Sequence, residues 1–308
     1  MKSCFNKLIN IIKNPRIIPI YFLNKGFLNW LSDEKYLSLR YRIITGKPLN
    51  LQNPKTFSEK LQWLKLNDRN PYYTQMVDKC AAKDYVAGLI GNQYIIPTLG
   101  TWERFEDIDF DILPSQFVLK CNHDSGGVVV CRDKNKLDRK KAKKMLDKHL
   151  KTNFFYASRQ QSYKNIQPKL IAEEYLEDKK DISKSGLSDY KFYCFHGKPQ
   201  FLYLSQGLED HKTAAISYVT LDWKKTNFHR TDYKEFEELP KKPLHLEKMI
   251  ELAEILSQGH YFLRVDFYEV NGNIYFGELT FYPGNGMTPF EPQEYETIFG
   301  DLIKIPIL

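Results

Sequence analysis

The chain is 308 residues long, with 42% hydrophobic residues, 27% charged residues and a formal net charge of +7. This length exceeds what one small hydrophobic core organises, so we expect two or three packed subdomains or one large α/β unit. The composition is that of a globular protein and excludes disorder on a large scale. The positive charge favours anionic ligands such as nucleotide phosphates, acidic sugars or the inner face of a membrane.

Three broad classes of protein find no support in the sequence. Nucleic-acid binding is not expected, because the densest basic stretch, residues 139–144, fits one solvated face of a helix. The five cysteines form no CxxC pair and no zinc spacing, which argues against a disulfide framework and indicates a reducing compartment, the cytoplasm. The most apolar N-terminal run, residues 17–23, is far shorter than the roughly 20 residues of a membrane span.

Residues 1–30 mix Lys and Arg with Ile, Leu, Phe and Trp30, and two interpretations fit this mixture. The segment could make a peripheral contact with the inner face of the membrane, or it could pack on the domain as a strap. Pro15 and Pro19 interrupt any continuous apolar face of a helix, so the strap is the favoured interpretation.

Apolar residues at helical spacing predict five helices. The first follows Ser32, which is typical of an N-cap, and ends before Gly46. The predicted helices cover residues 33–44, 56–66, 71–90, 136–151 and 244–258.

Short apolar or alternating runs predict eight strands, most of them paired as hairpins. The last two runs flank Asn271-Gly272, which is the strongest short hairpin signal in a sequence. Strands and helices do not alternate regularly, which favours an α+β fold built from antiparallel hairpins over a Rossmann fold or a barrel. The predicted strands cover residues 94–99, 117–120, 128–131, 170–176, 190–195, 200–205, 262–270 and 274–279.

The closing hairpin is the strongest candidate site. Side chains alternate between the faces of a strand, so Arg264 shares a face with Asp266, and Glu278 shares one with Thr280. Strand pairing then brings these groups together, roughly 5 Å apart. Such oxygen ligands suit Mg²⁺, which usually keeps waters and substrate phosphates in its shell. An Arg–Asp–Glu salt-bridge ladder on a solvated face fits the same composition.

A polar turn follows the strand that ends at Lys120. Its small residues Ser125, Gly126 and Gly127 can lay backbone N–H groups over phosphates, although no Walker motif is present. His123 stands in the same turn and is a candidate for contact with the substrate. Most Ser-Gly-Gly turns only close a hairpin, which is the alternative here.

Five more charged residues are candidates for a nucleotide site. Glu173 and Glu174 end an apolar run, where they could receive an adenine amino group and a ribose hydroxyl or could simply be exposed. Lys79 and Lys83 lie four residues apart on one face of a predicted helix, as surface lysines also do. Lys191 lies within an apolar strand, where a lysine usually has an anionic partner.

Taken in chain order, these segments resemble the ATP-grasp superfamily. They are similar to the lysine helix, the second lysine strand, the phosphate-covering loop, the adenine hinge, the catalytic Arg with the first metal carboxylate, and the E-x-N metal motif. These segments are, in the same order, residues 77–83, 117–120, 124–127, 171–176, 264–267 and 278–280. Thr280 stands where the family motif has Asn.

A closer resemblance is to the TupA-like, teichuronopeptide-biosynthesis type of ATP-grasp protein, from about residue 35 to the C-terminus. It rests on the segments 53–65, 78–79, 120–127, 189–195 and 277–284. It implies two antiparallel-sheet subdomains that sandwich ATP, preceded by a mainly helical N-terminal region. The implied division is 1–110 for the helical region, 111–176 for the lid subdomain and 177–308 for the catalytic subdomain.

The resemblance also implies a role for each candidate residue. The implied ATP-binding residues are Lys79, Lys83, Lys120, Ser125, Gly126, Gly127, Glu173, Glu174 and Lys191. Asp266 and Glu278, with Thr280, would hold Mg²⁺, which offsets charge on the transferred phosphoryl group. A substrate carboxylate would attack ATP to give an acyl phosphate, and an amine would displace phosphate. Arg264 would stabilise the oxyanion of the tetrahedral intermediate.

We therefore expect an ATP- and Mg²⁺-dependent carboxylate–amine ligase of bacterial surface polysaccharide synthesis. It would join an amino acid or related amine to a uronic-acid carboxylate of an acidic glycan, or of its sugar-nucleotide or lipid-linked precursor. Two alternatives stay open: an ATP-grasp phosphotransferase that phosphorylates a hydroxyl, and a non-catalytic component of polysaccharide assembly. A stable phosphate ester would identify the first, and the lack of thermal stabilisation by Mg-ATP would favour the second.

Overall fold

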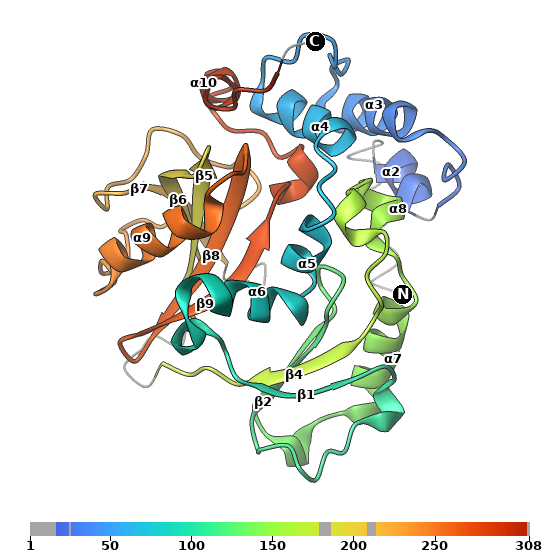
Figure 1. Ribbon diagram of the computed structural model, residues 1–308, viewed down its shortest axis with the longest axis vertical. Helices are drawn as coiled ribbons and strands as arrows, with labels where there is room; N and C mark the ends of the chain where they lie inside the picture. Colours follow the sequence, from blue (N-terminus) through green and yellow to red (C-terminus); the bar gives the residue numbers. More distant parts are fainter. Residues whose placement is uncertain (1–16, 25, 179–185, 208–213, 307–308) are drawn as a thin grey trace.

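The computed structural model describes residues 17–24, 26–178, 186–207 and 214–306, and its two antiparallel sheets carry helices around them (Figure 1). The α-helices are α2 (Ile17–Asn24), α3 (Asp33–Thr45), α4 (Phe57–Asn67), α5 (Tyr73–Val77), α6 (Ala81–Ile90), α7 (Arg139–Leu150), α8 (Phe154–Ser158), α9 (Leu246–Ser257) and α10 (Glu294–Leu302). The strands are β1 (Thr98–Trp102), β2 (Phe117–Cys121), β3 (Val128–Cys131), β4 (Leu170–Glu174), β5 (Asp189–Phe195), β6 (Lys198–Gln206), β7 (Ala215–Thr220), β8 (Phe262–Val270) and β9 (Asn273–Thr280). Short 3₁₀ helices are η1 (Asn92–Tyr94), η2 (Phe105–Asp107), η3 (Lys134–Lys136), η4 (Gln161–Tyr163) and η5 (Pro283–Gly286). The predicted α+β class is confirmed.

The N-terminal helices α3 and α4 start at side-chain caps that satisfy their first backbone N–H groups. Ser32 Oγ accepts from the third residue of its helix at 3.4 Å. Thr56 and Glu59 form a reciprocal capping box with N···O distances of 3.2 and 3.0 Å. α4 then buries Phe57 and Leu61 in the same core as the five-stranded sheet. The helical region is therefore part of the body that carries this sheet.

The helix predicted over residues 71–90 is wrong in one respect, because it is broken into α5 and α6 at residues 78–80. Asp78 Oδ1 accepts from the backbone N–H of Cys80 at 2.8 Å and from Asn122 Nδ2 at 3.0 Å. Lys79 N donates to Asn122 O at 3.0 Å. An Asp side chain that binds nearby backbone competes with helical hydrogen bonding, and here the loop after β2 fixes the break. Lys79 consequently lies in a turn and does not share a helix face with Lys83.

The four-stranded sheet has the order β1-β4-β2-β3, and all its neighbours are antiparallel. Leu119 on β2 and Ala172 on β4 face a core that includes Leu146 of α7, which covers this side of the sheet. The first strand begins at residue 98 and not at 94, because residues 92–94 form η1. The opposite face of the sheet carries Lys120 and Glu173, since side chains alternate along each strand.

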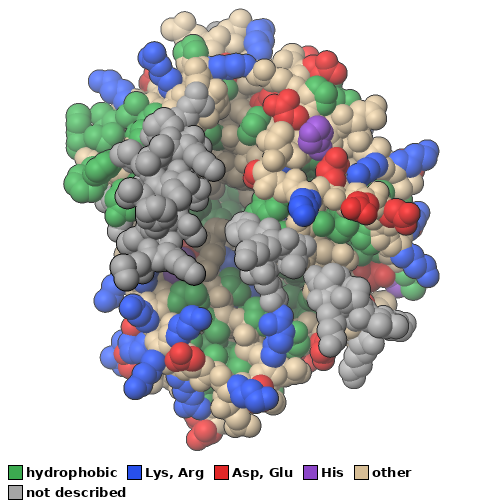
Figure 2. Space-filling view, turned by 180° about the vertical axis from the view of Figure 1, so that it is seen from behind, with side chains coloured by type: hydrophobic (Ala, Val, Ile, Leu, Met, Phe, Trp, Pro, Cys, Tyr) green, Lys and Arg blue, Asp and Glu red, His purple; other side chains and the backbone are tan. Residues whose placement is uncertain are grey.

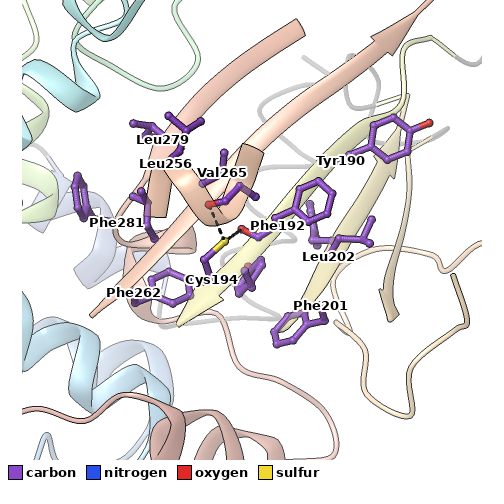
Figure 3. Packing of buried hydrophobic residues seen from close by; sticks show 14 of the residues in the cluster. Tyr190, Phe192, Cys194, Phe201, Leu202, Leu256, Phe262, Val265, Leu279 and Phe281 are labelled. Atoms are coloured by element: carbon purple, nitrogen blue, oxygen red, sulfur yellow. Dashed lines mark hydrogen bonds between the residues drawn. The ribbon is translucent and has the colours of Figure 1, made fainter. Parts of the chain in front are cut away.

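The five-stranded sheet has the order β7-β6-β5-β8-β9, again entirely antiparallel. Helix α9 covers one face, which buries Phe192, Cys194 and Val265 (Figure 3). Cys194 Sγ donates weak hydrogen bonds to Phe192 O at 3.7 Å and to Ala253 O on α9 at 3.9 Å. This thiol belongs to the core, and burial raises its pKa to about 12, so it is unreactive.

The other face of the five-stranded sheet looks toward the four-stranded sheet, with α5 and α6 beside the space between them (Figure 1). Alternation places Asp189 and Lys191 of β5 on this face, together with Arg264 and Asp266 of β8. The polar residues of the central strands are thus collected on the side that does not pack on α9. The candidate site residues of β5 and β8 therefore lie on the face that is turned toward the four-stranded sheet.

Candidate active site

A cavity of about 270 Å³ lies between the two sheets. Its wall combines the turn after β2, the end of β4, the polar face of β5, β8 and β9, and the start of α6. Apolar side chains also line the cavity, among them Ile96, Val128 and Leu279. The predicted site residues that line it are Lys79, Lys83, Lys120, Ser125, Gly126, Glu173, Lys191, Asp266 and Glu278. Residues separated by up to about 200 positions in the sequence are therefore brought to one cavity.

Asp266, Glu278 and Arg264 form one hydrogen-bonded group. Arg264 Nε and Nη2 donate to Asp266 Oδ1 and Oδ2 at 2.8 and 2.7 Å, and Nη2 also donates to Glu278 Oε1 at 2.5 Å. Thr280 Oγ1 donates to the same Glu278 oxygen at 3.2 Å. Asp266 is only 1% exposed. The predicted sharing of a face is confirmed, and a solvated salt-bridge ladder is excluded for Asp266.

A β-bulge sets the position of Glu278. Val265 pairs with Leu279 and Phe267 pairs with Phe276, so Gly277 and Glu278 together lie opposite the single residue Asp266. A bulge of this kind redirects a side chain without ending the strand. A Cβ at position 277 would lie 3.2 Å from Asp266 O and 3.3 Å from Asp266 Cβ. Glycine at this position therefore lets the two strands approach closely at the carboxylates.

Lys191 is the second cation of this group. Its Nζ lies 3.1 Å from both Asp266 Oδ2 and Asp189 Oδ1. Burial opposes the charged form of Lys191, but these two carboxylates outweigh it and raise the pKa of the lysine. Burial also opposes the charged form of Asp266. It raises the pKa of this carboxyl group, because it outweighs the opposite effect of Arg264 and Lys191. The buried charges thus depend on one another for compensation.

Glu278 has the opposite character to Asp266. Its environment disfavours charge, but Arg264, Lys191 and Lys79 outweigh this and lower the pKa of Glu278 to about 2. The side chain is 46% exposed, so solvent screens part of this effect. The site therefore offers one buried carboxylate and one accessible, ionised carboxylate.

On the facing sheet, Glu173 is held between two lysines. Lys83 Nζ lies 2.9 Å from Glu173 Oε1, and Lys120 Nζ contacts Glu173 Oε2. Lys83 Nζ also donates to Ile96 O at 2.6 Å. Burial opposes ionisation of Glu173, but Lys120 and Lys83 lower its pKa. This buried triad carries one net positive charge and faces the cavity.

The turn after β2 is fixed by two contacts of Asp124. Lys79 Nζ donates to Asp124 O, and burial lowers the pKa of this lysine. The Asp124 carboxylate contacts His149 Nδ1 at the end of α7. Gly126 adopts a φ of 103°, in the region that favours glycine. The backbone of the turn is thereby presented to the cavity beside Lys79.

The donor set fits Mg²⁺ only together with other ligands. Within the residues that the structure describes, no group of three or more His, Cys, Asp or Glu side chains could hold a metal ion. Asp266 and Glu278 supply two carboxylates, and one guanidinium nitrogen of Arg264 lies within 2.7 Å of both, at the place where a cation is attracted. Mg²⁺ commonly takes one or two carboxylates and completes its shell with waters and substrate phosphates. These residues therefore fit a magnesium–nucleotide complex and not a metal held by protein alone.

Comparison with known families identifies the family of the chain that carries this cavity. The sequence profile described as TupA-like ATPgrasp matches residues 59–304. The chain belongs to the TupA-like ATP-grasp family. The match covers both sheets and every site residue described above.

Known structures with a similar arrangement show low identity to this TupA-like chain. D-alanine–D-alanine ligase from Bacillus anthracis is 18% identical with a TM-score of 0.41, over 80% of this chain and 67% of that one. N5-carboxyaminoimidazole synthetase from Staphylococcus aureus is 15% identical with a TM-score of 0.42, over 80% of this chain and 59% of that one. The ATP-grasp ligase PsnB complexed with minimal precursor is 11% identical with a TM-score of 0.40, over 96% and 73%. The chain thus spans about three fifths of the synthetase, and no curated protein matches its sequence.

Some predicted site residues of this TupA-like chain lie outside the cavity wall. The Glu174 side chain is exposed on the opposite face of β4 and lines a different groove, so it does not face the predicted nucleotide site. Gly127 follows the wall residues of the turn, where an added Cβ would lie 2.9 Å from Asp124 Oδ1. Arg264 and Thr280 do not line the cavity but contact residues that do: Arg264 bonds to Asp266 and Glu278, and Thr280 bonds to Glu278.

His123 differs most from its predicted role. It is 3% exposed, and Nε2 contacts His149 O at 3.2 Å and Thr152 O at 3.1 Å. Its Nδ1 contacts Asn122 Oδ1 at 3.1 Å. Nε2 thus joins the turn to the end of α7, and Nδ1 makes its contact within the turn. The structure gives His123 a structural position in place of a contact with substrate.

Other residues of the site escaped the prediction. Asp189 neutralises Lys191, and its signal was present, because Asp-x-Lys at alternate positions of a strand puts both side chains on one face. Tyr163 and Tyr268 also line the cavity. Tyr163 comes from η4, in the connection between β3 and β4 of the four-stranded sheet, and carries no sequence pattern that marks it. The same is true of His149, whose partner Asp124 lies 25 residues away.

Proposed function

We propose that this chain is an ATP- and Mg²⁺-dependent carboxylate–amine ligase that acts on an acidic glycan. One observation carries the proposal: a cavity between two antiparallel sheets joins four lysines to the Asp266–Glu278 pair, with Arg264 bonded to both carboxylates. Cations on three sides suit a polyphosphate, and the carboxylate pair suits the metal that accompanies it.

In the proposed complex the lysines bind the phosphates of ATP. Lys79 stands beside the glycine turn, whose N–H groups would cover the phosphates. Lys120 and Lys83 contact Glu173. When a nucleotide binds, the same two lysines would contact both the carboxylate of Glu173 and the phosphates. Residues 171–176, which resemble the adenine hinge of the ATP-grasp superfamily, would lie beside adenine.

Asp266 and Glu278 would hold the magnesium, with Thr280 orienting Glu278 through its hydroxyl. When bound, magnesium offsets the charge that develops on the transferred phosphoryl group. Arg264 would have a role of its own, because its guanidinium is bonded to both carboxylates that line the cavity. A fixed cation at this point stabilises an oxyanion without reorganisation during the reaction.

The proposed reaction has two steps. A substrate carboxylate oxygen attacks the γ-phosphorus of ATP, and the bond from this phosphorus to the oxygen of the β-phosphate breaks. The products of this step are an acyl phosphate and ADP. An amine then attacks the acyl carbon, and the tetrahedral intermediate expels phosphate and loses a proton to give an amide. Arg264 faces the oxygen that bears the negative charge in the second step. Closure of the turn around Gly126 would exclude the water that hydrolyses acyl phosphates.

The acceptor we propose is a uronic-acid carboxylate of a bacterial surface polysaccharide or of its sugar-nucleotide or lipid-linked precursor. Membership of the TupA-like family supports this class, and the net charge of +7 suits an acidic glycan. The amine would be an amino acid or a related compound. We place the reaction in the cytoplasm, where ATP is available. In the described parts of the chain, no helix is long and apolar enough to cross a bilayer.

The test uses the purified full chain with Mg-ATP, glucuronic or galacturonic acid acceptors and a pool of amino acids. The proposal predicts ADP and phosphate in equal amounts and a new amide detected by mass spectrometry. Hydroxylamine in place of the amine should trap the acyl phosphate as a hydroxamate. A stable phosphate ester without free phosphate would identify a phosphotransferase instead, and a lack of turnover with every acceptor would contradict the acceptor class.

A further inference from the structure

An aromatic surface lies at the N-terminal end of the described chain, away from the nucleotide cavity. Tyr21, Phe22, Phe27 and Trp30 are 55%, 46%, 64% and 78% exposed, and we call these four residues the aromatic patch. The ring centroids of Tyr21 and Phe22 are 5.9 Å apart, and those of Phe22 and Phe27 are 5.3 Å apart. Figure 2 shows hydrophobic side chains gathered at the upper left, where α2 lies in this view. Such a cluster of exposed aromatic rings indicates an interaction surface.

The patch is held outward by a packed support. Leu23 of α2 is 1% exposed and anchors the helix on its inner side. Arg40 Nη1 on α3 donates to Asn24 Oδ1 at 2.7 Å, and Arg159 Nη2 donates to Asn29 O at 3.4 Å. The predicted strap is therefore present in the described part of residues 1–30, and the rings of the aromatic patch stay exposed on it.

The charge of the N-terminal segment, read from its sequence, distinguishes between partners. The first 32 residues contain five basic residues, Lys2, Lys7, Lys13, Arg16 and Lys25, and no acidic residue. In the sequence, Arg16 directly precedes α2 and Lys25 stands between Phe22 and Phe27. The first acidic residues are Asp33 and Glu34 in the first turn of α3. Asp33 is already engaged, at 3.3 Å from Arg69 and 3.7 Å from Arg159.

We propose that the aromatic patch docks this protein on the anionic surface of a lipid bilayer. Tyr and Trp rings favour the interface between headgroups and acyl chains, because one end of each ring is apolar and the other can hydrogen-bond. The basic residues among the first 32 would be attracted to anionic headgroups, each by about fivefold in the partition coefficient. Neither feature alone gives stable binding, but an apolar anchor combined with a basic segment does.

A second copy of the chain fits the surface less well. Two such surfaces face to face would oppose two sets of basic residues with no acidic residue among the first 32 to compensate them. An acidic protein partner would need apolar side chains spaced to match the four rings. A bilayer supplies both an apolar layer and a diffuse negative charge.

The experiment measures binding of the full chain to vesicles without nucleotide, so its failure would leave the proposed ligase activity untouched. Vesicles of phosphatidylcholine are compared with vesicles rich in phosphatidylglycerol, at low and high salt. We expect sedimentation with the anionic vesicles at least about tenfold above that with neutral ones, and a steep loss at high salt. Of the four tryptophans, Trp30 is the exposed one, so its emission should shift to shorter wavelength on binding.

Three variants complete the test. Phe27→Ser with Trp30→Ser should reduce binding at least about tenfold, whereas Trp30→Phe should keep most of the binding and lose the fluorescence shift. Ile112→Ser, at a residue 68% exposed on the lid side, is the matched control and should bind as the wild type does. Equal binding to neutral and anionic vesicles, no binding to either, or unchanged binding of the double variant overturns the proposal. A dimer in vesicle-free solution that the double variant abolishes also overturns it, in favour of a second copy.

Discussion

Lys191 Nζ on β5 lies 3.1 Å from Asp266 Oδ2 on the neighbouring strand β8. The Lys191 side chain is 10% exposed and that of Asp266 is 1% exposed, so this ion pair is shielded from water. Asp189 contacts the same ammonium group at 3.1 Å. The candidate metal ligand Asp266 is therefore part of a buried charge network that also contains Lys191 and Asp189.

Replacing this lysine tests the network. Lys191→Met keeps the length of the side chain but leaves Asp189 and Asp266 with one cation fewer in a buried site. We expect the free energy of unfolding to fall by about 3 kcal/mol, measured by urea denaturation. Lys198→Met, on the exposed start of the adjacent strand, is the control and should change stability by less than about 0.5 kcal/mol. Equal stability of both variants would show that the pair contributes nothing.

The pKa of Glu278 predicts a pH dependence of stability. Its value of about 2 in the folded protein lies below the 4.5 of a free glutamate. The folded state therefore binds fewer protons, and the contribution of the ionised carboxylate is full above about pH 4.5 and disappears as the pH falls toward 2. The difference in unfolding free energy between wild type and Glu278→Gln should be constant above about pH 5 and shrink below it. Glu254→Gln, at an exposed site on α9, should show no such trend, and a difference that grows in acid would contradict the assignment.

The bulge at Gly277 predicts that a substitution there lowers turnover strongly and stability only slightly. The Cβ of Gly277→Ala would lie 3.2 Å from Asp266 O and from Tyr268 Cε2, which is close enough to move the carboxylate strand by a few tenths of an ångström. We expect a loss of about 1 kcal/mol in stability and about tenfold or more in turnover. Gly88→Ala is the matched control, because its Cβ meets nothing within 4 Å and Gly88 lies inside α6. That variant should gain about 0.5–1 kcal/mol in stability with normal turnover.

Replacing His123 distinguishes a structural role of this residue from a role in substrate binding. His123→Ala removes a ring whose two nitrogens both contact polar atoms in a buried position, so stability should fall by about 2 kcal/mol. At a temperature where the variant is folded, KM for the acceptor should stay near the wild-type value. Unchanged stability with a raised KM would return His123 to the substrate site.

The local parts of the fold were predictable from the sequence. The hairpin β8–β9 follows from alternating residues around Asn271-Gly272, and the same alternation placed Asp266 and Arg264 on one face. The capped helices α3 and α4 follow from Ser32 and Thr56 in the same way. In each case, the signal and the structure that it specifies lie within about ten residues.

Features that depend on distant contacts were not predictable. The break before α6 requires Asn122, which is 44 positions from Asp78 along the chain. The bulge at Gly277 depends on the register between two strands, and a glycine in a strand does not by itself identify one. The engagement of Glu173 by two lysines needs the arrangement of α6, β2 and β4 together. The resemblance identified the family because it compares the whole series of segments, which no single motif does.

The central claim is that Asp266 and Glu278 bind the magnesium of Mg-ATP in this cavity. Isothermal titration calorimetry of the full chain with ATP, in the presence and absence of Mg²⁺, tests it most directly. The wild type and Glu254→Gln should bind ATP more tightly with Mg²⁺. Asp266→Asn and Glu278→Gln, with a circular dichroism spectrum like that of the wild type, should lose this dependence on the metal. Magnesium-dependent binding of equal strength in either variant would contradict the account.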